Sequence, residues 1–213
     1  MMKKLWEQFL YPRETHLSAV VSLFAVVLMM FCPGETEAQY GSYFTPQEAL
    51  EIAFAKGETV RVVTWQMMSA ESRTAIVREL GRGIPPGSIN CYQGSMAGRV
   101  VNYACIDTIR GFQSRITFLI KISHPEGGIA HYEIMYYGDP RGNNMRHGPF
   151  RAQFIGKKLT DPMEYGVDVR NMTGATKSAS ALRDGLRKML IFYQYFLKDL
   201  PLLTEKKDKM DEH

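Results

Sequence analysis

The sequence contains little cysteine and histidine: its 213 residues include three cysteines and five histidines. No CxxCH or multi-cysteine run is present, so neither c-type haem attachment nor an iron–sulfur cluster is indicated. No two histidines are four apart on a plausible helix, and we therefore expect no metal site. The GxxxxGK[ST], GxGxxG and GxSxG motifs are also absent, and we assign no catalytic residues.

Neither a concentrated charge of one sign nor a long hydrophobic run is present. The net charge is +4 and the basic residues are scattered, which makes nucleic acid a poor candidate partner. Residues 17–31 carry no charge but fall short of the ~20 residues that span a bilayer comfortably. With Lys3 and Lys4 before them, they are typical of a signal peptide cleaved near Ala38, although an uncleaved anchor or a buried helix are alternatives.

The rest of the chain has the composition of one globular domain. Apolar residues make up 45% and charged residues 23% of the sequence. We expect a signal peptide or N-terminal membrane anchor at 1–38, a domain at 39–203 and a charged, disordered tail at 204–213. Because the basic residues precede the hydrophobic run, the domain is expected outside the cytoplasm.

Local patterns predict helices near the start of this domain. Thr45 and Glu48 form a capping box around Pro46, and they predict a helix that buries Ala49, Ile52 and Ala53 and ends at Gly57. Ser69 is the expected cap of a second helix, through residue 80.

The middle of the chain is rich in β-type patterns. Residues 59–65 read as one strand, and 98–109, 114–122 and 129–137 as three more. Their short connections predict an antiparallel meander. Residues 150–157 read as a further short helix. Because the domain combines predicted helices with a mainly antiparallel sheet, the expected fold class is α+β, a twisted sheet with packed helices.

Two of the cysteines, Cys91 and Cys105, flank the first strand of this meander. In an exported domain they are candidates for a disulfide, which is worth about 3 kcal/mol for a loop of that length. Two buried thiols are the alternative.

The most informative stretch is 168–180, DVRNMTGATKSAS. It follows a short β-like run at 166–169 and precedes apolar residues at helical spacing, namely Leu182, Leu186, Met189, Leu190, Tyr193, Phe196 and Leu197. A helix is expected to start in or just after TGATKSAS, where free N–H groups and the helix dipole favour a phosphate. The alternative is that Thr173 or Thr176 merely caps a packing helix.

The segment TGATKSAS resembles the [S/T]GAT[x][S/T] motif of the FMN-binding domain family. This family includes the G subunit of the Rnf electron-transport complex and the C subunit of the sodium-translocating NADH:quinone reductase. Residues 44–54, 136–157 and 160–169 are also similar to it, so the resemblance covers roughly 43–197. It implies an FMN-binding-domain-like fold for residues 39–203. Arg170 and Lys177 differ from the acidic and apolar residues that are usual in the family.

In this family, the threonine that ends the GAT triplet carries FMN through a phosphoester bond made by a flavin transferase after export. The resemblance therefore implies covalent FMN on Thr176. It also implies supporting roles: Gly174 and Ala175 in the turn, Thr173 and Ser178 as caps or phosphate ligands, Lys177 or Arg170 as a nearby charge, Asp168 in transferase recognition, and Arg141, Gly142, Gln153 and Phe154 beside the flavin. For Gln153 and Phe154, a purely structural role is the alternative.

The function implied is electron transfer by a periplasmic protein, or one on the outer face of the cytoplasmic membrane, within a membrane-associated redox chain. Its partners are then the flavin transferase and other electron carriers. Two alternatives are a flavin-binding sensor module and an exported binding protein that keeps the fold but holds no cofactor.

Overall fold

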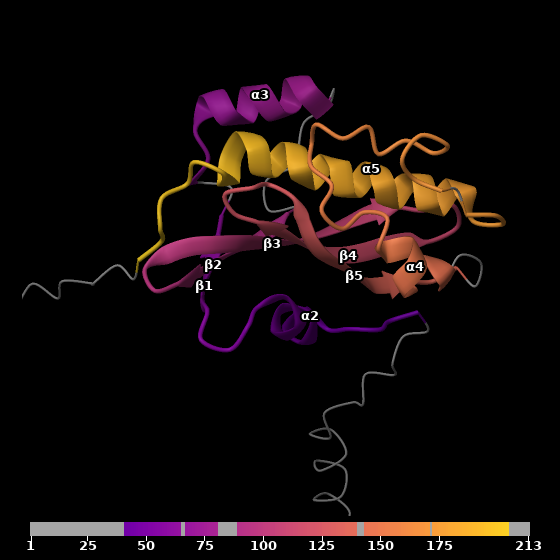
Figure 1. The fold of residues 1–213 in the computed structure, drawn as a ribbon, viewed down its shortest axis with the longest axis horizontal. Coiled ribbons are helices and arrows are strands. Elements are labelled where there is room, and N and C mark those ends of the chain that lie inside the picture. Colours follow the sequence, from indigo (N-terminus) through magenta and orange to yellow (C-terminus); the bar gives the residue numbers. More distant parts are fainter. Residues whose placement is uncertain (1–40, 65–66, 81–88, 140–142, 171, 205–213) are drawn as a thin grey trace, which may run out of the picture. The chain divides into compact units, whose positions relative to one another are not determined.

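The computed structural model describes residues 41–64, 67–80, 89–139, 143–170 and 172–204 (Figure 1). Contacts divide the chain into two units, Met1–Gln39 and Tyr40–His213, and every described residue belongs to the second. The predicted signal peptide or anchor, Arg141, Gly142 and the predicted tail after residue 204 lie outside the described residues. No helix among the described residues has the length and apolarity to cross a membrane.

Five strands form one antiparallel sheet in the order of the sequence. They are β1 (Thr59–Val63), β2 (Asn90–Met96), β3 (Arg99–Arg110), β4 (Arg115–Ser123) and β5 (Ile129–Tyr137). Neighbouring strands are neighbours in the chain, as expected when the connections are short. The prediction of an α+β fold built on a mainly antiparallel sheet is confirmed.

The sequence did not predict strand β2. Its residues, NCYQGSM, include a glycine and mostly polar side chains, which weakens the usual strand pattern. Pairing with β1 and β3 nevertheless buries Cys91, Gln93 and Ser95. Cys91 lies directly opposite Cys105 in this ladder, and the structure joins the two in the predicted disulfide.

The helices begin where their caps predict. Helix α2 (Pro46–Ala53) has the complete Thr45–Glu48 capping box, and α3 (Ala70–Leu80) follows Ser69, whose Oγ accepts a hydrogen bond from the N–H of Ser72 at 3.1 Å. Helix α4 (Gly148–Arg151) is one short turn after the 3₁₀ turn η2 (Asn143–Arg146). Helix α5 (Thr176–Phe192) continues into a single π-helical turn, η3 (Tyr193–Leu197).

Helices cover both faces of the sheet (Figure 1). Helix α5 lies across one face over the larger part of the core, and α3 packs against α5 and η3. All seven apolar positions predicted for the α5 pattern are buried. Gly185 allows α5 to lie close to strands β3 and β4, because a Cβ there would lie 3.0 Å from side-chain carbons of Ile109 and Phe118. Helix α2 covers the opposite face with Ala49 and Ala53.

Four local predictions were wrong. Helix α2 ends at Ala53 rather than Gly57, and Ile52 is 46% exposed because the buried stripe follows Ala49 and Ala53. The helix predicted at 150–157 is limited to Gly148–Arg151 and continues as turns. Residues 166–169 form a turn closed by an isolated bridge between Tyr165 and Val169, not a strand.

The end of the described chain is attached to β2. The buried side-chain amide of Gln93 donates to the carbonyl of Pro201 at 3.0 Å and accepts from the N–H of Leu203 at 2.7 Å. The Tyr103 hydroxyl also accepts from Gln93, at 3.0 Å. One buried amide thus connects the second strand with the last described residues.

Candidate functional site

The TGATKSAS segment forms the start of helix α5, as predicted, but not the predicted cap. The helix begins at Thr176 after Ala175, and no side chain caps it. The Thr176 hydroxyl donates instead to the carbonyl of Met172 at 3.2 Å, and Thr173 is exposed. The first N–H groups of a helix have no intrahelical partners, so this end of α5 presents uncapped donors.

A cavity of about 250 Å³ opens at this end of the helix. Its lining comes from the α5 start, the end of β5 with the residue after Gly138, and the β3–β4 turn: Phe112, Tyr137, Asp139, Gly174, Ala175, Thr176, Lys177 and Ser178. Gly174 has a φ of +84°, a conformation that suits glycine and turns the chain into the helix. Five of the six residues predicted at 173–178 therefore line one cavity.

Ser178 fastens the β3–β4 turn to the helix. Its side chain is 1% exposed, and its Oγ accepts from the N–H of Phe112 at 3.1 Å. Burial raises the pKa of the Tyr137 phenol, while a hydrogen bond with Ser178 opposes that rise. The Ser178 hydroxyl is thus buried and bonded to the β3–β4 turn, while the residue also lines the cavity, and its phosphate role stays a prediction.

Opposite charges line the cavity. The ammonium of Lys177 lies 4.6 Å from the centre of the Phe112 ring, within the range of a cation–π contact. The Asp139 side chain is 5% exposed. The cavity therefore offers a cation and an aromatic surface near the helix start, and a buried carboxyl group elsewhere in its wall.

Replacing Ser178 with alanine should loosen the β3–β4 turn. The change leaves the Phe112 N–H and the Tyr137 hydroxyl without this partner, which should lower the free energy of unfolding by about 1–2 kcal/mol. Urea denaturation measures the loss, and hydrogen exchange at Phe112 should speed up. Thr173→Ala, an exposed hydroxyl in the same motif, is the control; equal effects of both changes would contradict the fastening role.

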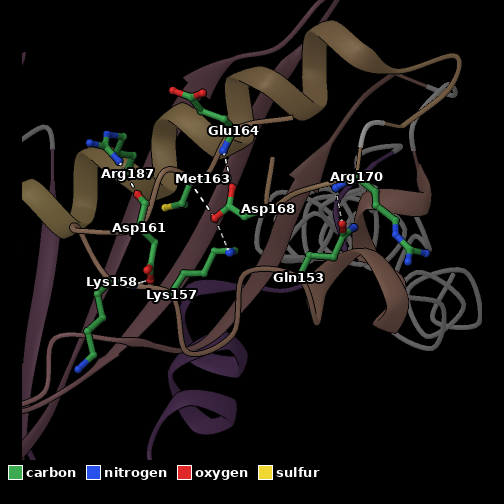
Figure 2. A network of polar contacts seen from close by, with 9 residues as sticks. All are labelled: Gln153, Lys157, Lys158, Asp161, Met163, Glu164, Asp168, Arg170 and Arg187. Carbon is green, nitrogen blue, oxygen red and sulfur yellow. Dashed lines mark hydrogen bonds and ion pairs between the residues drawn. The ribbon is translucent and has the colours of Figure 1, made fainter. Parts of the chain in front are cut away.

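Asp168 belongs to a different network, which Figure 2 shows. Its carboxylate accepts from Lys157 Nζ at 2.6 Å and from the backbone N–H groups of Met163 and Glu164 at 3.1 and 2.7 Å. Met163 has a φ of 51°, which residues other than glycine seldom adopt. The network stabilises this turn and attaches it through Lys157, whose carbonyl accepts from Ile129 of β5 at 2.9 Å.

The stability contributed by Asp168 should depend on pH. The hydrogen bond from Lys157 is the main cause that lowers the pKa of the Asp168 carboxyl. Its contribution is therefore present above the pKa of the unfolded chain and is lost as the pH falls through the lowered folded-state pKa. Asp168→Asn should remove this acid dependence and speed hydrogen exchange at Met163 and Glu164. Asp184→Asn on α5 is the control, and unchanged exchange in Asp168→Asn would contradict the role.

Gln153 and Arg170 lie beside a second, larger groove. Gln153 Oε1 accepts from the N–H of Arg170 at 2.6 Å (Figure 2). The groove has a volume of about 770 Å³ and is lined by Pro149, Phe150, Gln153, Gly166, Val167, Asp168, Val169 and Arg170. Asp168 and Gln153 thus line the same groove, but neither lines the cavity at Thr176.

Phe154 lies in the core, in agreement with the structural alternative left open for it. Its side chain is fully buried, with its ring 5.9 Å from that of Tyr132 in an edge-on contact and 5.4 Å from that of Phe150. A residue enclosed in this way cannot lie against an added ring. Its apolar character reflects core packing.

Sequence reasoning missed three residues of the cavity: Phe112, Tyr137 and Asp139. The turn after Arg110 was visible as a strand connection, but nothing local shows that its tip bonds to a helix more than sixty residues later. Asp139 lies just after β5, and no motif around it marks it as a cavity residue.

No protein-family model matches the chain, and no curated protein matches it significantly.

Proposed function

We propose that this chain is an exported flavoprotein with an FMN-binding-domain-like fold, carrying FMN as a phosphoester on Thr176. The observation that supports the proposal best is the position of Thr176. It is an exposed hydroxyl residue at the uncapped start of α5, and it lines a cavity that also contains an aromatic ring and a lysine.

The residues present suit a phosphate on Thr176 Oγ. The first-turn N–H groups and Lys177 supply donors and positive charge, and the helix dipole favours an anion there. Esterification removes the Thr176 hydroxyl hydrogen that now donates to the Met172 carbonyl. The contacts of the phosphate with the N–H groups and Lys177 must therefore compensate for the loss of this hydrogen bond. The Asp139 carboxyl repels an anion, which favours the helix end of the cavity over its other walls.

The size of the cavity bears on where the rest of the cofactor lies. At about 250 Å³ it is below the ~300–1,000 Å³ of typical ligand pockets, so it accommodates only part of FMN. Phe112 is 50% exposed and offers an apolar ring at the cavity wall. When bound, the isoalloxazine supplies the redox chemistry, while the chain supplies attachment, orientation and electrostatics.

The cellular setting belongs to the same proposal. The protein carries electrons outside the cytoplasm, as part of a membrane-associated redox chain, after a flavin transferase has modified it. Covalent attachment suits such a location, because a cofactor lost there is not easily replaced. The motif resemblance and the N-terminal sequence support this setting.

The intact mass of the chain, coexpressed with a flavin transferase, tests the proposal. We expect a gain equal to FMN less water, together with flavin absorbance that persists after denaturation. The transferase must be shown active on a known substrate in the same cells. An unmodified mass under those conditions would overturn the covalent-carrier proposal and favour an exported binding protein without cofactor.

A further inference from the structure

The end of the sheet where β3 turns into β4 carries two arginines directly opposite each other. Arg110 pairs with Arg115 in the antiparallel register, and both are exposed. By alternation they share a face with Thr108 and Thr117, whose hydroxyl oxygens lie 2.9 Å apart. Like charges directly opposite each other destabilise a strand pair, so this arrangement has a cost in the protein alone.

Neighbouring cations are paired with carboxylates, whereas Arg110 and Arg115 have no such partner in the part of the chain that the structure describes. Lys188 forms an ion pair with Asp107, and Arg183 binds Asp184 through two nitrogens at 2.8 and 2.6 Å. Within the described ranges, neither Arg110 nor Arg115 forms an ion pair with a carboxylate. Two guanidinium groups are therefore available to an external anion.

The surface around them is hollowed. Grooves of about 320 and 450 Å³ share Thr108, Ile109 and Arg110, and the larger one also reaches Ser114 and Arg115. Between the two arginines in sequence is Phe112, which is half exposed and also lines the cavity at Thr176. Charge, concavity and an aromatic side chain thus occur together at one end of the sheet.

We propose that this surface, defined by Arg110, Phe112 and Arg115, docks an acidic protein. The planar guanidinium groups match carboxylates in two-point contacts, and arginine and aromatic residues are enriched at the centres of protein interfaces. An anionic bilayer fits less well, since Phe112 is the only exposed large apolar side chain of residues 111–114 and offers little apolar area to bury in lipid.

Arg110 and Thr108 alternate onto the face of Ile106, on the side of α2, whereas the cavity at Thr176 lies on the side of α5. Phe112 lines that cavity as well, so a partner that contacts Phe112 reaches its edge. An acidic electron carrier would then lie next to the flavin. This consequence rests on the proposed function, whereas the docking itself does not require a cofactor.

Binding of poly-L-glutamate to the purified full chain tests the surface. We expect Arg110→Glu and Arg115→Glu each to weaken binding by about fivefold or more at low salt, with the wild-type affinity falling as salt rises. The matched control is Arg99→Glu, an exposed arginine at the other end of β3, which should change the affinity less than about twofold. Either reversal also creates an opposite-charge pair across β3 and β4, so urea denaturation should show unchanged or higher stability.

Equal weakening by all three reversals would overturn the proposal, because it would indicate attraction by net charge alone. Binding to poly-L-glutamate that none of the three reversals changes would also overturn it. Arginine-dependent binding to phosphatidylglycerol vesicles without binding to poly-L-glutamate would overturn it too, because it would indicate a membrane surface. The intact mass of each preparation is recorded beforehand. Binding by unmodified chains supports the docking surface even if the flavin proposal fails.

Discussion

Thr176→Ala should abolish covalent flavin attachment completely, since alanine offers no oxygen for a phosphoester. The variant coexpressed with the transferase should keep its unmodified mass and lose the flavin absorbance that survives denaturation. The fold should persist, because Thr176 is exposed and its side chain makes a single hydrogen bond, to the Met172 carbonyl. Thr176→Ser, which keeps a hydroxyl at the same place, should regain at least part of the modification.

The control for this experiment is Thr173→Ala. Thr173 is also exposed and belongs to the same motif, but it does not line the cavity. The control should be modified as the wild type is. If Thr173→Ala loses the flavin and Thr176→Ala keeps it, the acceptor has been misidentified, although the chain is still a flavoprotein.

Removing the disulfide should produce the largest loss of stability. The double change Cys91→Ala with Cys105→Ala opens a link between residues separated by 14 positions, both 1% exposed or less. Loss of the constraint on the unfolded chain should lower the free energy of unfolding by about 3 kcal/mol. Urea denaturation at neutral pH measures the difference between the midpoints of unfolding.

Reductant supplies the control for the disulfide. Dithiothreitol should shift the unfolding of the wild-type chain toward that of the double variant and leave the double variant unchanged. A loss below about 1 kcal/mol would show that the unfolded chain without the disulfide retains structure that restricts it around Cys91 and Cys105.

The parts of the fold that were predicted correctly depend on local chemistry. The capping box of Thr45 and Glu48 requires only neighbours, and the meander follows from β-branched runs with connections too short for crossovers. The apolar spacing of α5 likewise requires one buried face. Each of these signals is complete within about twenty residues of sequence.

The errors occurred where tertiary contacts override a local pattern. Strand β2 forms from polar residues because strands on both sides satisfy its backbone. The site shows the same division. The start of α5 was predicted from its motif, whereas the position of Phe112 depends on a bond to Ser178 that links distant segments.

The attachment of the last residues to Gln93 has a consequence for the order in which the protein matures. All five strands are present once residue 137 has been synthesised, yet helix α5, which covers one face of the sheet, begins at Thr176, and the partners of Gln93 are Pro201 and Leu203. During synthesis, the face of the sheet that α5 covers therefore stays exposed until residues 176–203 have emerged. A premature stop before Pro201 would leave the Gln93 amide buried without two of its partners, so such fragments should be preferred targets of chaperones and proteases.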